Sequence, residues 1–167
     1  MANLVLIECL SLPFLIMKML LILLQGVDHS FLIRNGIVES SGENYDGQLG
    51  NGYCELDQYE YSDNECDSSE SEYEEGKYTF EPILNASKFN KVTAIYAGPS
   101  ISLLINDGIV YGCGRNYDQL GIISDEKKIK EFTAADNTDE FINENIIAIS
   151  DGGVYTLILK HEGEKGG

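Results

Sequence analysis

The sequence predicts an all-β protein that is built from a repeated unit of short antiparallel strands, and two observations support this prediction. First, residues 26–50 return as residues 98–121, with a spacing of 72 residues over most of their length. A self-similarity of this length is a true internal repeat, so it guides the interpretation of the rest of the chain. Second, each copy holds two β-prone runs that are separated by Asn35-Gly36 or by Asp107-Gly108. Such pairs favour a type I′ hairpin turn because both residues tolerate a positive φ.

The two copies share their glycines and a set of polar residues. We predict that these residues are structural, because glycines free the backbone for tight turns and Asn or Gln side chains brace it. The predicted structural residues are Gly26, His29, Ser30, Gly36, Gly42, Asn44, Gly47, Gln48, Leu49 and Gly50 in the first copy and Gly98, Ser102, Gly108, Gly114, Asn116, Gln119, Leu120 and Gly121 in the second.

The order of these residues resembles the repeat of the regulator of chromosome condensation family. The shared pattern is Gly-x-x-His-Ser, then the hairpin glycine, then Gly-x-Asn and Gly-Gln-Leu-Gly. The second copy departs from it at Ile101, where the motif has His, and lacks the glycine before Gln119. The resemblance implies β-propeller-type blades of antiparallel strands.

A third copy of the unit begins at Ala148 and continues to Leu159, with a spacing of 54 residues from the second. It stops before its hairpin glycine. The resemblance therefore covers roughly residues 19–159 and implies an incomplete propeller within this chain. Because two and a fraction repeats leave strand edges and sheet faces uncovered, we expect a shortened or fragmentary relative, self-association, or marginal folding.

The repeat spacings divide the chain, whose 167 residues suit one ordinary domain. We predict an apolar N-terminal segment of unclear role at 1–18, a first propeller-type repeat at 19–52, and an acidic disordered insertion at 53–79. A second repeat with a long connection follows at 80–147, and a truncated third repeat with a frayed tail occupies 148–167. Within the second repeat, Phe80–Leu84 is predicted as a strand with Pro82 at a sheet edge, and the connection 122–145 allows a short helix.

Residues 1–25 are the most apolar part of the chain and have two interpretations. In the first, Leu20–Leu24 is a strand that leads into the repeat, because it stands where the second copy has Val92–Tyr96. In the second, the segment targets or anchors the chain. Glu8, Pro13 and Lys18 weaken a membrane span, and no basic region or clear cleavage site marks a signal peptide. We therefore expect that the chain is not an integral membrane protein.

Charge limits the classes of partner. The chain has a net charge of −17, which argues against direct nucleic-acid binding and favours a basic protein partner. Residues 53–81 hold eleven acidic residues against Lys77 alone, a net charge of −10, with few apolar residues to stabilise a fold. Ser62, Ser69 and Ser71 each precede a glutamate by three residues. This pattern predicts phosphorylation by an acid-directed kinase, the alternative being a solvated run of charge.

The sequence predicts no catalytic, cofactor or metal site. His29 and Ser30 are adjacent on a strand, so their side chains point to opposite faces and form no catalytic dyad; a structural role, in which one of them bonds a neighbouring turn, is preferred. The glycines of 42–50 lack the lysine of a phosphate-binding loop. The acidic run lacks the glycine and final glutamate of a calcium loop, and the four cysteines show no zinc-binding spacing.

These observations favour a non-catalytic protein-protein interaction module with an acidic loop suited to basic partners. The resemblance implies one alternative, guanine-nucleotide exchange on a small GTPase, although none of the repeat residues can be assigned to that activity. A second alternative, a membrane-anchored or secreted repeat protein, depends wholly on residues 1–25. The sparse, unpatterned cysteines favour the cytoplasm or nucleus.

Overall fold

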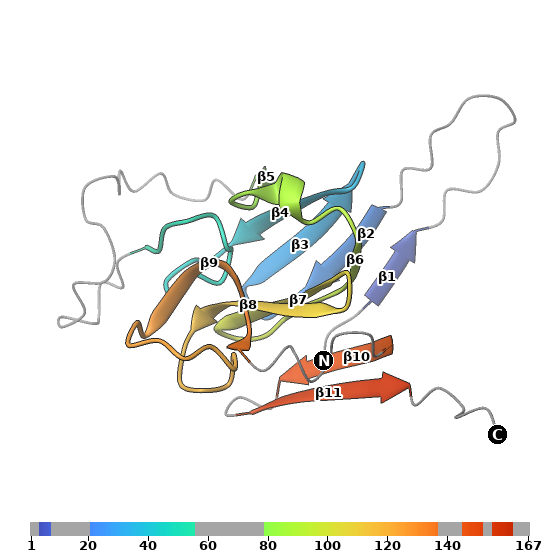
Figure 1. Cartoon of the computed structure of the whole chain (residues 1–167). Coiled ribbons are helices and arrows are strands. Elements are labelled where there is room, and N and C mark those ends of the chain that lie inside the picture. The colour runs from blue at the N-terminus through green and yellow to red at the C-terminus, as the bar shows by residue number, and fades with distance from the viewer. Residues whose placement is uncertain (1–3, 8–20, 56–78, 137–144, 152–154, 162–167) are drawn as a thin grey trace, which may run out of the picture.

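A computed structural model describes residues 4–7, 21–55, 79–136, 145–151 and 155–161, and these residues form three antiparallel sheets (Figure 1). Within those ranges the one helical element is a single 3-10 turn, Ala86–Lys88. The structure thus confirms the all-β prediction. No helix in the described part of the chain is long and apolar enough to span a membrane.

The first sheet holds five strands in sequence order, so each strand pairs with its neighbour in the chain. They are β1 (Leu4–Ile7), β2 (Leu21–Gln25), β3 (His29–Arg34), β4 (Ile37–Gly42) and β5 (Glu81–Pro82). Strand β2 confirms the strand predicted before the first repeat. Strand β5 confirms a proline-containing edge strand, where the missing N–H of Pro82 leaves no ladder bond unmade. The pairing of β1 with β2 was not predicted.

The second sheet holds four strands, again in sequence order. They are β6 (Val92–Ala97), β7 (Ile101–Asn106), β8 (Ile109–Arg115) and β9 (Lys128–Ala134). Within the connection 122–145, where a short helix was considered, Lys128–Ala134 form strand β9 instead, and residues 137–144 lie outside the described residues. The buried residues Ile129 and Phe132 of β9 are three apart, a spacing that suits a helix, but here they pack into two different clusters on opposite faces of the sheet. Odd spacing places strand residues on opposite faces, so a strand satisfies both contacts.

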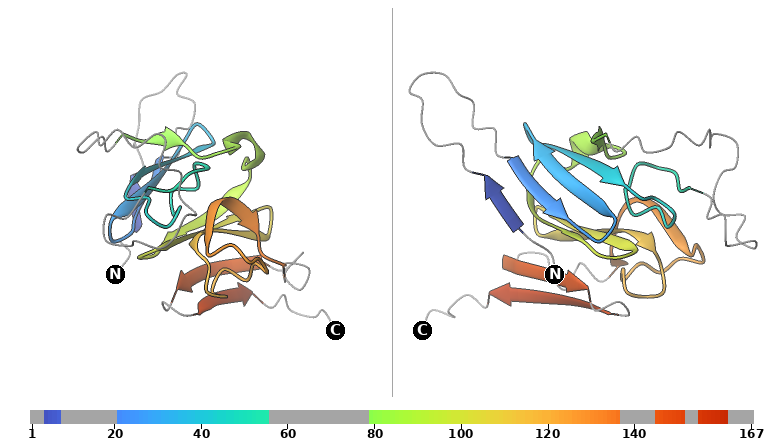
Figure 2. Two further views of the ribbon diagram at one scale, coloured as in Figure 1. Left: turned by 90° about the vertical axis from the view of Figure 1, so that its left-hand side faces the viewer. Right: turned by 180° about the vertical axis from the view of Figure 1, so that it is seen from behind.

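The third sheet is a hairpin of β10 (Asn145–Asp151) and β11 (Thr156–His161). Two further views show the second sheet lying between the first sheet and this hairpin (Figure 2). A five-stranded and a four-stranded antiparallel meander followed by a hairpin are the form expected of propeller-type blades. Within the described ranges the sheets do not close into a ring.

The hairpin turns have the predicted conformation. Asn35 and Gly36 have φ of 54° and 76°, and Asp107 and Gly108 have φ of 54° and 79°. Two consecutive positive φ values are the mark of a type I′ turn. Arg34 accordingly pairs with Ile37 directly across the two-residue loop, which confirms the hairpin.

Two hydrophobic clusters hold the sheets together. The larger joins the first and second sheets; its central members include Phe31 and Val38 from the first sheet and Leu104 from the second, all fully buried. The smaller joins the second sheet to the hairpin, where Ile149 of β10 packs against the cluster of Ile101 and Leu103. Because β7 has a cluster on each face, all of its residues are buried, and its sequence is a nearly continuous apolar run.

Candidate functional site

A chain of buried hydrogen bonds joins the first repeat to the second. His29 Nε2 lies 2.8 Å from Ser102 Oγ, and the Ser102 hydroxyl donates to the backbone carbonyl of Gln48 at 2.7 Å. Since that hydroxyl proton points at Gln48, His29 must donate through Nε2–H and carries its free lone pair on Nδ1. Nδ1 is buried with no hydrogen-bond partner. His29 therefore bonds a strand of the next repeat, and Ser102 makes the contact to the turn.

This histidine and serine have the spacing of a base and a nucleophile, but their environment excludes that chemistry. The exposed fractions are 2% for His29 and 0% for Ser102, so a substrate cannot reach either side chain. Burial lowers the pKa of His29 to about 4, which keeps the imidazole neutral near pH 7. The pair is a structural contact. The pairing was not predicted, because Ser102 stands 73 positions from His29 in the sequence whereas Ser30 is its neighbour.

The same kind of contact recurs at the next junction. Thr156 Oγ1, which stands 54 positions after Ser102, donates to the carbonyl of Gln119 at 2.6 Å. Each later repeat therefore places a hydroxyl on the carbonyl of the Gln in the repeat before it. At the first junction an ion pair adds to this, because Arg115 Nε lies 3.0 Å from Asp46 Oδ1.

The predicted Asn and Gln residues of the repeat brace their own loops. Asn44 Oδ1 accepts the N–H of Leu49, and its Nδ2 donates to the carbonyl of Tyr53. Asn116 Nδ2 likewise donates to the carbonyls of Ile122 and Glu126. The structure places Asn44, Gly47, Gln48, Leu49 and Gly50 in the loop after β4, and Asn116, Gln119, Leu120 and Gly121 in the loop after β8.

Glycines are required where the ends of β4 and β8 lie against the turns that precede β3 and β7 in the same repeat. At Gly114, with φ of 107°, a Cβ atom would lie 2.3 Å from the carbonyl oxygen of Ser100. At Gly42, with φ of 118°, it would lie 2.4 Å from the carbonyl oxygen of Asp28. Both the φ value and the contact exclude a larger side chain. This explains why the two copies share a glycine here.

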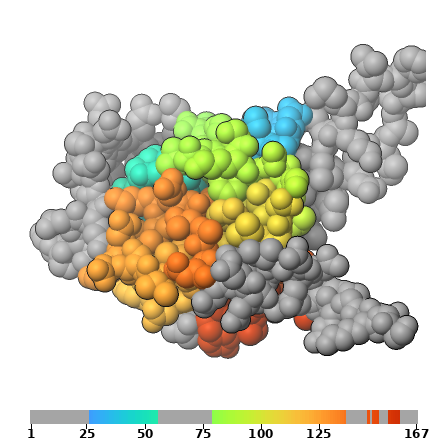
Figure 3. Space-filling view, in the orientation of Figure 1, coloured from blue at the N-terminus to red at the C-terminus, as the bar shows by residue number. Residues whose placement is uncertain are grey.

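A groove lies where the loop after β4 meets strand β9. It has a volume of about 510 Å³. The backbone N–H of Gly52 donates to the carbonyl of Lys130, which joins the loop to the strand beside the groove. The space-filling view shows the green residues that follow position 79 next to the orange residues of β9 (Figure 3). The groove is lined by Gly52, Leu84, Ile122, Ile123, Ser124, Glu126, Ile129, Lys130, Glu131, Thr133, Ala134 and Asp136.

The lining of the groove combines exposed apolar side chains with negative charge. Leu84 is 41% and Ile123 87% exposed. Three carboxylates, those of Glu126, Glu131 and Asp136, stand against the single ammonium group of Lys130. The groove is therefore a partly apolar surface with an excess of negative charge.

The acidic segment joins the described part of the chain close to this groove. Within the insertion 53–79, Glu55 is the last residue described before the gap at 56–78, and it stands three positions after Gly52 of the groove lining. Burial, together with the negative charge of Glu43, raises the pKa of Glu55. Carboxylates thus already crowd one another at the point where the segment leaves the fold. Residues 56–78, which include Ser62, Ser69 and Ser71, lie outside the described residues.

The described residues hold no group of three or more His, Cys, Asp or Glu side chains that could bind a metal ion. Cys113 is fully buried, and burial raises the pKa of its thiol. Cys54 is also buried and is disulfide-bonded. That bond was not predicted from the cysteine spacing.

Comparison with known proteins gives partial structural similarity. No family model and no curated protein matches this sequence. Among solved structures, the chain is similar to human WBSCR16, with a TM-score of 0.47 and 21% sequence identity over 68% of this chain. The match spans 25% of the length of that protein.

Proposed function

We propose that this chain is a non-catalytic protein-interaction module of the regulator of chromosome condensation repeat type. Its acidic segment and the groove beside β9 together bind a basic protein partner. The segment supplies long-range attraction, and the groove supplies a surface on which an extended Lys- or Arg-containing stretch of the partner docks.

The bonding of the repeat residues supports a role without catalysis. Inside the protein, His29 and Ser102 hydrogen-bond to each other, and Ser102 also donates to the Gln48 carbonyl. Asn44 and Asn116 are held by backbone groups of their own loops. These four polar residues of the repeats are thus engaged in holding the scaffold, and we assign function to the loops that the scaffold carries.

One observation carries the choice of partner: the groove with its excess of carboxylates lies beside the point where the acidic segment leaves the fold. Negative charge from both sources steers a basic partner toward the same place. The exposed side chains of Leu84 and Ile123 offer apolar contact to the methylene stems of Lys or Arg. Charge and shape therefore favour a basic, extended ligand.

Deletion of Glu55–Glu75 tests the proposal. We expect the affinity for a basic protein such as a histone to fall at low salt, while near-UV circular dichroism shows that the fold persists. A chain that binds as tightly after the deletion would contradict the proposal. If the deletion only causes precipitation, the segment is a solubiliser.

Two adjacent acidic residues allow the effect of charge in the groove to be distinguished from the effect of the protein's overall negative charge. Glu126 lines the groove and its neighbour Asp125 does not, and both are exposed. Glu126→Lys and Asp125→Lys change the net charge equally. We expect Glu126→Lys to weaken binding of the basic protein clearly more than Asp125→Lys does. Equal effects would remove the groove from the proposal and leave only the acidic segment.

A further inference from the structure

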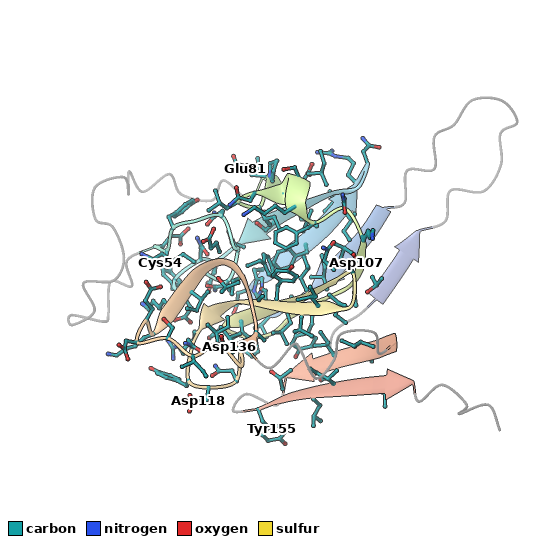
Figure 4. All side chains as sticks on the ribbon, in the orientation of Figure 1. Cys54, Glu81, Asp107, Asp118, Asp136 and Tyr155 are labelled. Carbon is teal, nitrogen blue, oxygen red and sulfur yellow. The ribbon has the colours of Figure 1, made fainter. Side chains whose placement is uncertain are left out.

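The last hairpin carries an exposed apolar face. Tyr155, Leu157 and Leu159 are 56%, 61% and 58% exposed, whereas Thr156 and Ile158 between them are partly buried. This alternation places the three exposed residues on one side of the hairpin, here called the β11 face. Figure 4 shows Tyr155 on the side turned away from the second sheet. Three neighbouring large apolar side chains in water indicate a surface that another molecule covers.

The repeat shows what this face does in the preceding unit. The residues 54 positions earlier are Ile101, Leu103 and Ile105 of β7, which are only 2%, 1% and 1% exposed. The hairpin covers that side of β7: Ile149 of β10 packs against the cluster that contains Ile101 and Leu103. The equivalent face of the second sheet is thus buried by the next sheet in the series.

The first sheet follows the same rule. Phe31 and Ile33, which stand 72 positions before Leu103 and Ile105, pack against Ile95 and Leu104 of the second sheet. In both observed junctions, therefore, this face of one unit packs against a β-sheet. Only the β11 face lacks such a cover among the described residues.

We propose that the β11 face packs against the β11 face of a second copy of this chain, which gives a dimer with two-fold symmetry. An apolar face is complementary to itself, and two-fold contacts between identical patches are the commonest in homo-oligomers. Two β-sheets that pack face to face in this way bury both sets of side chains, as the sheets within each copy already do.

The other sheet end of the molecule is a poorer partner for this face. There, Ser30, Leu32 and Arg34 lie on the side of β3 opposite to Phe31. Leu32 is already 8% exposed, so it has little surface left to bury. Arg34 forms an ion pair with Glu39 at 2.9 Å, and covering a charged pair with apolar side chains is unfavourable. A head-to-tail contact is therefore disfavoured relative to the two-fold one.

Charge predicts how salt affects this dimer. Each copy has a net charge of −17, so the two copies repel each other. Added salt screens that repulsion, and a contact made by apolar side chains does not depend on attraction between charges. The dimer should therefore be weak and concentration-dependent, and it should become stronger as salt is raised.

Sedimentation velocity of the full chain over a range of concentrations tests the proposal. We expect a monomer–dimer equilibrium for the unchanged protein, and a monomer for Leu157→Lys and for Leu157→Asp. Both variants should fold, since Leu157 is largely exposed in one copy. Ile37→Lys is the matched control, because Ile37 is an exposed apolar residue of the first sheet, which does not belong to the hairpin; it should leave the dimer intact.

Mixing the two Leu157 variants tests the symmetry. Leu157 is the middle residue of the three, so in the two-fold dimer it lies near Leu157 of the other copy. An equimolar mixture of the Lys and Asp variants should therefore recover dimers that neither forms alone. A monomeric unchanged protein, a dimer that survives Leu157→Lys, or a mixture that remains monomeric would each overturn the proposal.

Discussion

At the scale of single residues, the buried His29 links stability to pH. Burial lowers its pKa in the folded protein to about 4, below the value of about 6.5 in an unfolded chain. Between these values the unfolded chain binds a proton that the folded protein does not. The contribution of neutral His29 is therefore fully present above pH 6.5 and is lost as the pH falls toward 4.

We predict that this loss reaches roughly 3 kcal/mol, since one pKa unit corresponds to about 1.4 kcal/mol. Carboxylates also titrate in this range, so the measurement compares two proteins. The free energy of unfolding of the unchanged protein, minus that of His29→Gln, should decrease as the pH is lowered from 6.5 to 4. A difference that does not vary with pH would show that His29 is not held neutral by burial.

The hairpin glycine Gly36 makes a second prediction at this scale. A Cβ atom there would meet nothing within 4 Å, so any loss of stability must come from its φ of 76°. Gly36→Val should lower the free energy of unfolding by roughly 1–3 kcal/mol, because a β-branched residue is strained at positive φ. Gly36→Asn is the control and should lose much less, since Asn tolerates this conformation. Denaturant unfolding that ranks the two variants equally would argue against the type I′ turn.

At the scale of elements, each junction has a hydrogen bond from a hydroxyl of one sheet to a carbonyl in a loop of the repeat before it. Ser102→Ala removes the partner of His29 Nε2 and leaves the Gln48 carbonyl with only the longer bond from Cys113 Sγ, whereas Thr156→Val removes only the donor to the Gln119 carbonyl. Unpartnered buried polar groups destabilise by about 1–3 kcal/mol each. We therefore predict a loss of roughly 2–4 kcal/mol for Ser102→Ala and about 1 kcal/mol for Thr156→Val. Thermal unfolding that shows the reverse order would contradict this assignment.

The elements that depend on local chemistry could be predicted from the sequence. The turns at Asn35-Gly36 and Asp107-Gly108 follow from residues that tolerate positive φ, and the edge position of Pro82 follows from its missing N–H. Strand β9 could not be predicted in the same way. Ile129 and Phe132 are three positions apart, a spacing that fits a strand only when both faces of the sheet are covered by other parts of the protein. Whether both faces are covered depends on the assembled fold.

The hydrogen bonds that join the two repeats also could not be predicted from the sequence. His29 and Ser102 are separated by 73 positions in the chain, and the repeat pattern shows that both positions are special without showing that they meet. In the second copy Ile101 replaces the histidine, and this replacement was the sequence signal that favoured a structural role for His29. At the second junction the hydroxyl–carbonyl bond is made without a histidine, so the histidine is an addition to the shared contact.

At the scale of the whole molecule, charge and apolar surface act in opposite directions. The acidic segment and the groove favour a basic partner, and that attraction weakens as salt is added. The β11 face favours a second copy, and that contact strengthens as salt is added. Guanine-nucleotide exchange on a small GTPase and membrane attachment through residues 1–25 stay predictions of the sequence.

The most direct test of the proposed function is the salt dependence of binding between the full chain and a lysine-rich protein. Because the attraction is between exposed charges, it is screened over a Debye length of about 10 Å at 0.1 M salt and over shorter distances at higher salt. Isothermal titration at increasing salt should therefore show tight binding at low ionic strength and a steep loss of affinity as salt rises. An affinity that does not change with salt, or no binding at low salt, would contradict the proposed role of the negative charge.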